Sequence, residues 1–155
     1  MKNTETAFKW IVDIIQKHNI PFQIKGGLAS RLYGVDRELA DIDISIPEDR
    51  FDEIIPDIRS FIKYGPDQYK DEEWDIKLIT LKYEGQYIDI SGAFEKKNFD
   101  KHNQKWVKTP SNFETSVYMD VYGLRVPVIA KEDLVAYKKL IQRDVDIFDL
   151  GTLEK

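Results

Sequence analysis

Residues 41–47 read Asp-Ile-Asp-Ile-Ser-Ile-Pro, a strict alternation of polar residues with isoleucine. A two-residue period is typical of a β-strand, because successive side chains of a strand point to opposite faces. Asp41 and Asp43 therefore share one face of the expected strand, while Ile42 and Ile44 point to the other. The stretch predicts a strand with an apolar core face and a polar face that carries two carboxylates.

Two carboxylates on one face lie roughly 7 Å apart along the strand, since each residue advances by about 3.3 Å. Like charges at this separation repel each other unless a cation lies between them. Oxygen ligands of this kind suit Mg²⁺, so Asp41 and Asp43 are candidate metal ligands. The alternative is a solvent-facing strand with two ordinary aspartates.

A second aspartate-bearing stretch lies downstream, where Tyr87-Ile88-Asp89-Ile90-Ser91 repeats the alternation. If this strand neighbours the first one, about 4.8 Å away, Asp89 completes a cluster of three carboxylates. The alternative is an aspartate at the rim of the sheet.

A pair of glycines, Gly26 and Gly27, lies about fifteen residues before the first aspartate. It separates a short expected strand over residues 22–25 from an expected helix over residues 28–33. Such a turn lets backbone N–H groups and the helix dipole face a phosphate group. A plain tight turn is the common alternative, but a phosphate turn followed by a twin-aspartate strand is a much rarer combination.

The rest of the chain predicts an α+β fold of one domain over residues 1–155, with a mixed β-sheet and helices packed mainly on one face. Two hairpins are expected, one around residues 84–85 and one turning near residues 122–123. Apolar spacing predicts the helices, which cover residues 6–18, 28–33, 48–61, 131–141 and 145–150. No internal repeat or linker divides the chain.

The composition limits the chemistry of the protein. The chain has 28 acidic and 23 basic residues, a net charge of −5, no cysteine and two histidines. Thiolate sites and multi-imidazole sites are excluded, so catalysis has to come from carboxylates with Lys, Arg, Ser, Thr and Tyr. A net acidic chain is a poor candidate for a non-specific nucleic-acid-binding protein, because affinity for the phosphate backbone comes mainly from Lys and Arg. No signal peptide and no apolar run of about 20 residues is found, so a cytoplasmic protein without membrane contact is expected.

These features together resemble a known superfamily. Lys25-Gly26-Gly27, Arg37 four residues before the first aspartate, Asp41-Ile42-Asp43-Ile44 and the later Asp89 are similar to the signature of nucleotidyltransferases with the DNA polymerase β-like catalytic fold. Residues 130–150 look like the helix pair that closes the branch of small antibiotic and toxin–antitoxin nucleotidyltransferases. The resemblance spans residues 24–150. Two positions depart from it, with Lys25 where the pattern prefers an apolar residue and Leu39 where many members place Ser or Thr.

The resemblance implies a metal-dependent transfer of a nucleoside monophosphate from an NTP, preferably ATP, to a hydroxyl group of an unidentified acceptor. Two Mg²⁺ ions would bind the nucleotide phosphates, and Asp89 would act as a ligand or as the general base. The metal-binding and catalytic residues implied are Asp41, Asp43 and Asp89. The nucleotide-binding residues implied are Gly26, Gly27, Ser30, Arg37 and Lys138.

Some of these basic residues could instead have a purely structural role. Arg37 could form a surface ion pair with Glu38 or Asp36, and Lys138 could lie on a solvated helix face. Arg143 is expected to form structural ion pairs with Asp144 and Asp146.

The acceptor and the partners stay open at this stage. The acidic balance favours a small or cationic molecule, such as an aminoglycoside- or lincosamide-type antibiotic. The basic, aromatic stretch over residues 96–108 could instead contact RNA or a protein acceptor, or be a solvated loop. A homodimer or a partner protein could complete the site. The alternative function is a toxin–antitoxin or regulatory binding module of the same fold that acts on a protein or RNA partner. A third interpretation is an α+β domain whose aspartates have only a structural role.

Overall fold

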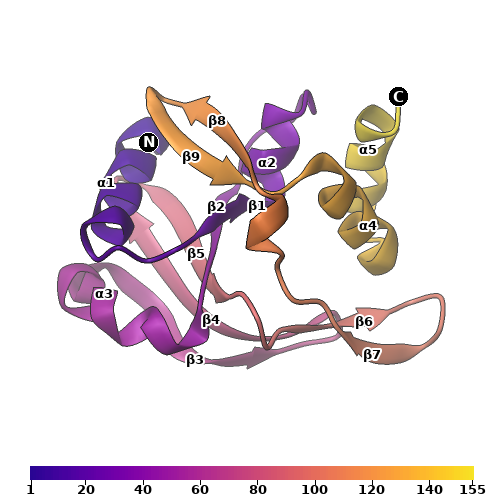
Figure 1. Ribbon diagram of the computed structural model, residues 1–155, viewed down its shortest axis with the longest axis horizontal. Coiled ribbons are helices and arrows are strands. Elements are labelled where there is room, and N and C mark those ends of the chain that lie inside the picture. Colours follow the sequence, from indigo (N-terminus) through magenta and orange to yellow (C-terminus); the bar gives the residue numbers. More distant parts are fainter.

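The computed structural model describes residues 1–155 and is built on one mixed nine-stranded sheet (Figure 1). Eight strands follow the order β7-β6-β4-β5-β2-β1-β9-β8, and β3 pairs with β4 beside this path. The β2–β5 and β1–β9 pairs are parallel and the others are antiparallel. The strands are β1 (Gln23–Lys25), β2 (Asp41–Ile46), β3 (Ile62–Lys70), β4 (Trp74–Tyr83), β5 (Gln86–Gly92), β6 (Lys97–Asp100), β7 (Lys105–Lys108), β8 (Val117–Val121) and β9 (Leu124–Val128).

Five α-helices accompany the sheet, and this arrangement confirms the predicted α+β fold with a mixed sheet. They are α1 (Thr4–Lys17), α2 (Gly26–Leu32), α3 (Phe51–Ile58), α4 (Lys131–Ile141) and α5 (Asp144–Leu153). Three 3₁₀ turns add η1 (Glu48–Arg50), η2 (Arg59–Phe61) and η3 (Phe113–Thr115). No helix of the structure is both long and apolar enough to cross a membrane.

The isoleucines of β2 and β5 form the centre of the core. Ile42, Ile44, Ile88 and Ile90 are fully buried and belong to one cluster of 29 residues that also contains the apolar faces of α1 and α3. Helix α1 begins where the Asn3 side chain accepts a hydrogen bond from the backbone N–H of Thr6, which satisfies a free donor of the first turn. The apolar face of the strand pair is thus covered, and its opposite face is left for polar side chains.

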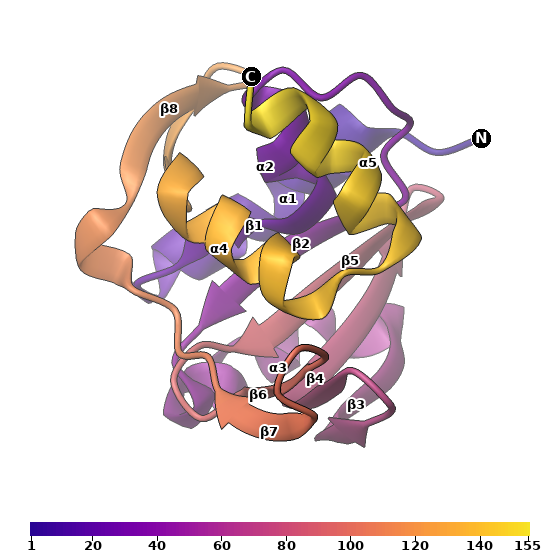
Figure 2. The ribbon, with the colours of Figure 1, turned by 90° about the vertical axis from the view of Figure 1, so that its right-hand side faces the viewer.

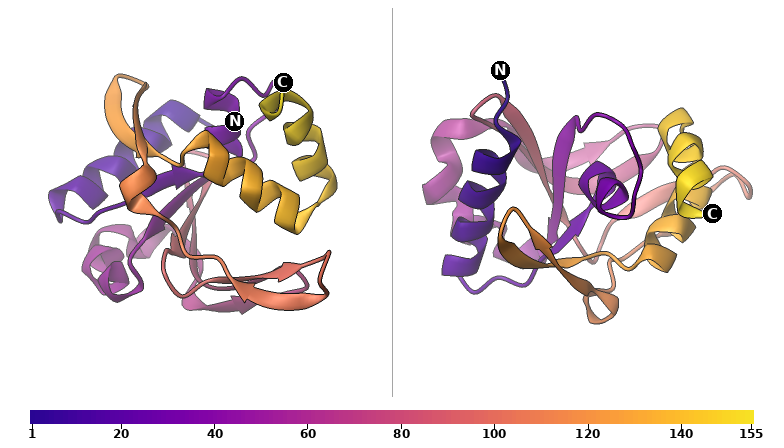
Figure 3. Two further views of the ribbon diagram at one scale, coloured as in Figure 1. Left: turned by 45° about the vertical axis from the view of Figure 1, so that its right-hand side comes forward. Right: turned by 90° about the horizontal axis from the view of Figure 1, so that it is seen from above.

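Helices α4 and α5 lie on the polar side, in front of β1, β2 and β5 (Figure 2). They are at the far end of the molecule from α1 and α3 (Figure 3). The short connection between β9 and α4 brings the last part of the chain, residues 131–155, back across this face. As a result, the polar face of the central strands has a sheet floor and a helical wall.

Both hairpins expected from the sequence are confirmed, with β4 and β5 joined at Glu84–Gly85 and β8 and β9 joined at Tyr122–Gly123. Three other expectations need correction. The helix expected over residues 48–61 is divided into η1, α3 and η2, and Pro56 lies inside α3, where it removes one backbone donor. The last helix does not end at Gly151 but continues to Leu153, because a glycine inside a helix costs only about 1 kcal/mol and does not remove a backbone hydrogen bond.

The third correction concerns the basic stretch over residues 96–108. It is not a solvated loop but contains the hairpin of β6 and β7, in which Phe99 and Trp106 are register partners with ring centroids 5.6 Å apart. Lys96, at its start, is 3% exposed. The aromatic pair and the burial explain why a lysine-rich segment is ordered here.

Candidate active site

Three aspartates meet on the polar face of the central strands. Asp41 and Asp43 are two residues apart on β2, and Asp89 on β5 is the register partner of Asp43 in the parallel pair. Side chains at paired positions of neighbouring strands point to the same face. The structure therefore brings together the three carboxylates that the sequence singled out, and all three line one cleft.

Burial and mutual repulsion make the ionised forms of these aspartates costly. Burial, together with the charges of Asp89 and Asp41, raises the pKa of Asp43 to about 7, although Lys25 opposes the shift. Burial also raises the pKa of Asp89, against a 2.7 Å hydrogen bond from Thr80 Oγ1 to Asp89 Oδ1. The pKa of Asp41 is raised by burial as well. A cation at this face would stabilise the ionised carboxylates.

The donor set fits a hard divalent cation that arrives with a ligand. Carboxylate oxygens are the side-chain donors that Mg²⁺ prefers, and it is usually held by one or two carboxylates together with substrate phosphates and water. No three acidic or imidazole side chains of the structure converge closely enough to form a complete protein-only ion site. The residues therefore fit Mg²⁺ bound jointly with a nucleotide rather than a closed protein cage.

The cleft above the carboxylates has a volume of about 680 Å³. It is lined by residues of β1, β2, β4 and β5, of α4 and the start of α5, and of the end of β3. Trp74 Nε1 of β4 donates a 2.6 Å hydrogen bond to the hydroxyl of Tyr137 on α4, which joins the sheet to the helical side. The aromatic side chains that line the cleft are Tyr69, Trp74, Tyr87 and Tyr137. This size lies within the range of small-molecule and cofactor sites.

Gly26 is required where the chain passes the carboxylates. Its φ angle is +61°, a left-handed conformation that residues with a side chain seldom adopt, and a Cβ atom here would overlap the Asp43 carboxylate. At Gly27, a Cβ atom would lie 3.4 Å from both terminal nitrogens of Arg37. The two glycines thus let the backbone approach Asp43 and Arg37 closely at the edge of the cleft.

A sequence comparison now decides the family. The family model described as Aminoglycoside-2″-adenylyltransferase matches residues 7–153. The chain belongs to this adenylyltransferase family. No curated protein sequence matches the chain significantly.

Solved structures of nucleotidyltransferases share the fold of this family member. A protein from Thermotoga maritima described as a nucleotidyltransferase has a TM-score of 0.72 at 22% identity, over 99% of this chain and 93% of that one. The lincosamide antibiotic adenylyltransferase LnuA, solved with lincomycin, has a TM-score of 0.63 at 15% identity, over 100% and 98% of the two chains. ANT(2″)-Ia, solved with adenylyl-2″-tobramycin, has a TM-score of 0.63 at 16% identity, over 97% and 87%. These likenesses support the predicted nucleotidyltransferase fold, and the family match supports the predicted antibiotic branch.

In this member of the adenylyltransferase family, Arg37 is held by α5. Its Nε and Nη2 donate to the two oxygens of Asp149 at 2.7 and 2.9 Å. The expected alternative partners Glu38 and Asp36 are not used. Arg37 lines the cleft beside Gly27, as a nucleotide-binding role requires.

Lys138 of α4 is a buried residue that borders the cleft. It is 2% exposed, so it does not lie on a solvated helix face, and its Nζ is 2.8 Å from Asp149 and 3.2 Å from Asp146. Arg143 donates to Asp146 as expected, at 2.8 and 3.0 Å, and its guanidinium lies 4.6 Å from the centre of the Trp74 ring. The charge of Lys138 is therefore already balanced by two buried aspartates, although its side chain borders the cleft.

Ser30 lies away from the cleft. It is fully buried within α2, one helical turn beyond Gly26, and its hydroxyl has no hydrogen-bond partner. It is not among the lining residues. A contact between Ser30 and nucleotide phosphates is not supported by this placement, because the residue points into the core side of the helix.

Two residues that line the cleft, one lysine and one tyrosine, were not predicted as site residues from the sequence. Lys25 and Tyr137 line the cleft, and Lys25 is the register partner of Asp43 on the side opposite Asp89. The unusual lysine before Gly26 was the available signal for the first. Tyr137 carries no local signal, because only the packing of α4 brings it to the sheet.

Proposed function

We propose that this nucleotidyltransferase-family protein transfers a nucleoside monophosphate, preferably AMP from ATP, to a hydroxyl group of a small-molecule acceptor in a Mg²⁺-dependent reaction. The observation that carries the proposal is the in-register pairing of Asp43 with Asp89, next to Asp41, on the floor of a cleft. The family match and the antibiotic adenylyltransferases among the structural neighbours support the same reaction class.

In this reaction the acceptor hydroxyl oxygen forms a bond to the α-phosphorus, and the bond from that phosphorus to the bridging oxygen breaks to release pyrophosphate. Bound Mg²⁺ would neutralise phosphate charge and make the acceptor hydroxyl more acidic. Asp41 and Asp43 would hold the ion, since their carboxylates face the cleft from one strand.

Asp89 is suited to receive the proton of the acceptor hydroxyl. Thr80 occupies Oδ1 of this carboxylate with a 2.7 Å hydrogen bond, which fixes the side chain and leaves Oδ2 for the substrate. Burial raises the pKa of Asp89 and so makes the carboxylate a stronger base than an exposed aspartate. Loss of this group should therefore affect the transfer step more than nucleotide binding.

Arg37, Gly26 and Gly27 would orient the triphosphate. The bidentate contact with Asp149 uses Nε and Nη2 of Arg37, so Nη1 is the nitrogen that remains for a ligand. The absence of side chains at the two glycines lets a phosphate approach the backbone closely beside this guanidinium.

A small acceptor is favoured by the size of the cleft. A volume of about 680 Å³ is typical of a small-molecule site. The ligands of two structural neighbours, lincomycin and adenylyl-2″-tobramycin, are small molecules. The aromatic side chains Tyr69, Trp74 and Tyr87 offer flat surfaces against which a nucleobase or an acceptor ring could pack.

Calorimetry of ATP-analogue binding tests the first half of the proposal. The wild-type protein should bind a non-hydrolysable ATP analogue in the presence of Mg²⁺ and much more weakly in excess chelator. The double variant Asp41→Ala/Asp43→Ala should lose the Mg²⁺-dependent part. An exposed control, Asp120→Asn on β8, should bind like the wild type, since its side chain is 75% exposed and remote from the cleft. Absence of nucleotide binding by the wild type would reject the proposed function.

A further inference from the structure

The ammonium groups of Lys25 and Lys96 both lie against the aromatic ring of Tyr137, near the carboxylates. Lys25 Nζ lies 5.3 Å from the centre of the Tyr137 ring, and Lys96 Nζ lies 4.7 Å from the same centre. The two ammonium groups lie close enough for the charge of Lys25 to lower the pKa of Lys96. They come from distant segments, since Lys25 ends β1 and Lys96 precedes β6.

Neither ammonium group belongs to an ion pair of the structure, in contrast to Lys138, Arg37 and Arg143 nearby. Lys96 Nζ donates a 3.2 Å hydrogen bond to the hydroxyl of Thr109, which is uncharged. Lys96 is 3% exposed, and the carboxylate facing Lys25 from the neighbouring strand belongs to Asp43. A buried ammonium group without an ion-pair partner is unfavourable, so this pair is a place where an anion would be stabilised.

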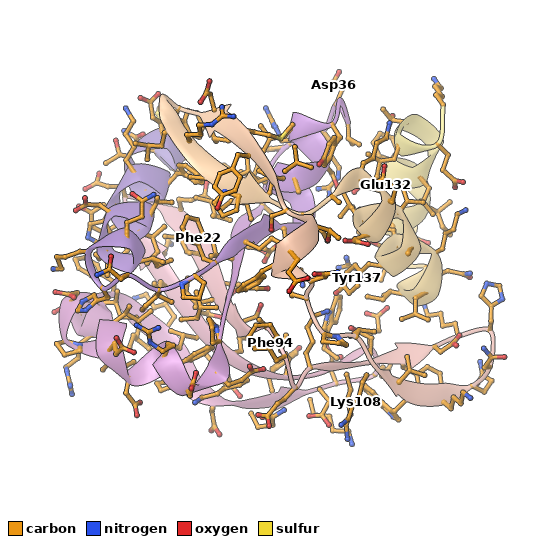
Figure 4. The ribbon with its side chains drawn as sticks, in the orientation of Figure 1. Phe22, Asp36, Phe94, Lys108, Glu132 and Tyr137 are labelled. Atoms are coloured by element: carbon orange, nitrogen blue, oxygen red, sulfur yellow. The ribbon has the colours of Figure 1, made fainter.

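The pair borders the proposed reaction centre. Across the sheet, Lys25, Asp43, Asp89 and Thr80 follow one another at paired positions of β1, β2, β5 and β4. Lys25 lines the cleft, whereas Lys96 is not a lining residue and lies against the ring of Tyr137. Helix α4 directs Tyr137 towards the sheet and the β6–β7 hairpin (Figure 4). An anion in the cleft would therefore reach Lys25 first and be backed by the charge of Lys96.

We propose that Lys25 and Lys96, held by the ring of Tyr137, form a subsite for an anionic oxygen group of a substrate. This rests on the proposed function only for the identity of the substrate. The anion is either a phosphate of the nucleotide or an acidic group of the acceptor.

Burial is the main cause of the lowered pKa values of both lysines. Burial lowers the pKa of Lys96 well below its usual value, and the neighbouring charge of Lys25 adds to this. Burial also lowers the pKa of Lys25, although Lys96 and Asp43 oppose the shift. A bound anion would favour the charged forms of both.

Inorganic pyrophosphate, titrated calorimetrically without Mg²⁺ and without nucleotide, tests the subsite. The variants are Lys25→Met and Lys96→Met, and the matched control is Lys97→Met, an exposed lysine adjacent in sequence. We expect each of the first two changes to weaken binding at least tenfold, as for loss of a charged hydrogen bond, and the control to match the wild type. Removal of an uncompensated buried charge should also leave the melting temperature of the two variants equal to or above that of the wild type.

Absence of pyrophosphate binding by the wild type, or equal binding by all four proteins, would overturn the subsite. Because no nucleotide is present, this result is independent of the proposed transfer reaction. Pyrophosphate binding that depends on both lysines in a protein without transferase activity would keep the subsite and reject the function.

A second titration separates the two sources of the anion. The protein is first saturated with Mg²⁺ and an ATP analogue that has a methylene bridge between its α- and β-phosphorus. If the nucleotide phosphates occupy the subsite, pyrophosphate binding disappears. If pyrophosphate still binds and still requires Lys25 and Lys96, the subsite is free for an acidic group of the acceptor.

Discussion

Asp43 of β2 and Asp89 of β5 are register partners in adjacent parallel strands, so their carboxylates occupy the same polar face of the sheet. The pKa of Asp43 is raised to about 7 by burial and by the charges of Asp89 and Asp41. The ionised Asp43 carboxylate is therefore unfavourable in the folded state, which lowers the free energy of unfolding. This destabilisation grows as the pH rises above the value at which Asp43 ionises in the unfolded chain. Catalytic groups commonly carry such a cost.

Asp43→Asn should stabilise the metal-free protein at pH 8 by about 1–2 kcal/mol, the size often found when an active-site constraint is relieved. Between its unfolded value of 3.8 and its folded value of about 7, Asp43 binds a proton in the folded state but not in the unfolded state. The stability of the wild type therefore falls as the pH rises through this window. Urea unfolding at pH 4 and pH 8 should show that the gain from the substitution is present at pH 8 and absent at pH 4. A gain that is equal at both values would contradict the charge explanation.

Gly26→Ala should destabilise the fold by about 2 kcal/mol or more and abolish transfer, because the left-handed backbone alone costs about 1–2 kcal/mol and the added Cβ atom would displace the Asp43 carboxylate. Gly27→Ala is the matched control, since its Cβ atom would meet Leu39 and Arg37 at 3.3–3.4 Å and needs only a small adjustment. Thermal unfolding should separate the two variants. Equal behaviour would show that the approach of Gly26 to Asp43 is unimportant.

Asp149→Asn should destabilise the protein by about 3–5 kcal/mol, as when one partner of a buried ion pair is removed. Asp149 is fully buried and binds both Arg37 and Lys138, and these hydrogen bonds hold its pKa below the usual value although burial alone would raise it. Denaturant unfolding is the measurement. Asp120→Asn, which affects an exposed pair at 3.5 Å, should change stability by no more than about 0.5 kcal/mol.

Because Arg37 is oriented by Asp149, the same substitution should also weaken binding of the ATP analogue in the fraction that remains folded. This effect should be larger than that of Lys139→Met, which removes an exposed pair between Lys139 and Glu154. Unchanged nucleotide affinity in Asp149→Asn would remove Arg37 from the nucleotide site.

Asp89→Asn should lower the rate of nucleotide transfer at least a hundredfold while it changes the affinity for the ATP analogue by less than tenfold, since loss of a general base costs about 10²–10⁴ in rate. The amide keeps a hydrogen-bond acceptor for Thr80, so the local structure should persist. Single-turnover kinetics together with calorimetry separate the two effects. A loss confined to nucleotide affinity would assign Asp89 to binding alone.

The central strands were predictable because their sequence agrees with their environment. In β2 and β5 the isoleucines alternate with aspartates, and the structure places every isoleucine in the core and every aspartate on the polar face. The sequence alone did not predict that β2 and β5 pair with each other. This pairing is long-range, because one helix and two strands lie between β2 and β5 in the chain.

In other elements the sequence pattern did not indicate the structure that the segment adopts. Strand β3 contains Gly65-Pro66 and is mostly exposed, so its sequence carries no alternation, and it is ordered by its partner β4. The roles of Lys138 and Arg37 were not predictable in detail because Asp149 is 112 positions from Arg37 in the sequence. Burial of Lys96 under Tyr137 likewise results from packing between distant segments.

The most direct test of the account is incubation of the protein with Mg²⁺ and ATP labelled at the α-phosphate, with a panel of aminoglycosides, lincosamides and other hydroxylated small molecules, RNA and cell-extract protein. We predict that the wild type transfers labelled AMP to a small molecule and releases pyrophosphate, and that Asp41→Ala, Asp43→Ala and chelator abolish the transfer. Label that appears on no acceptor, or transfer that persists in the Asp41→Ala/Asp43→Ala double variant, would contradict the assignment of this carboxylate cluster as a nucleotidyltransferase active site.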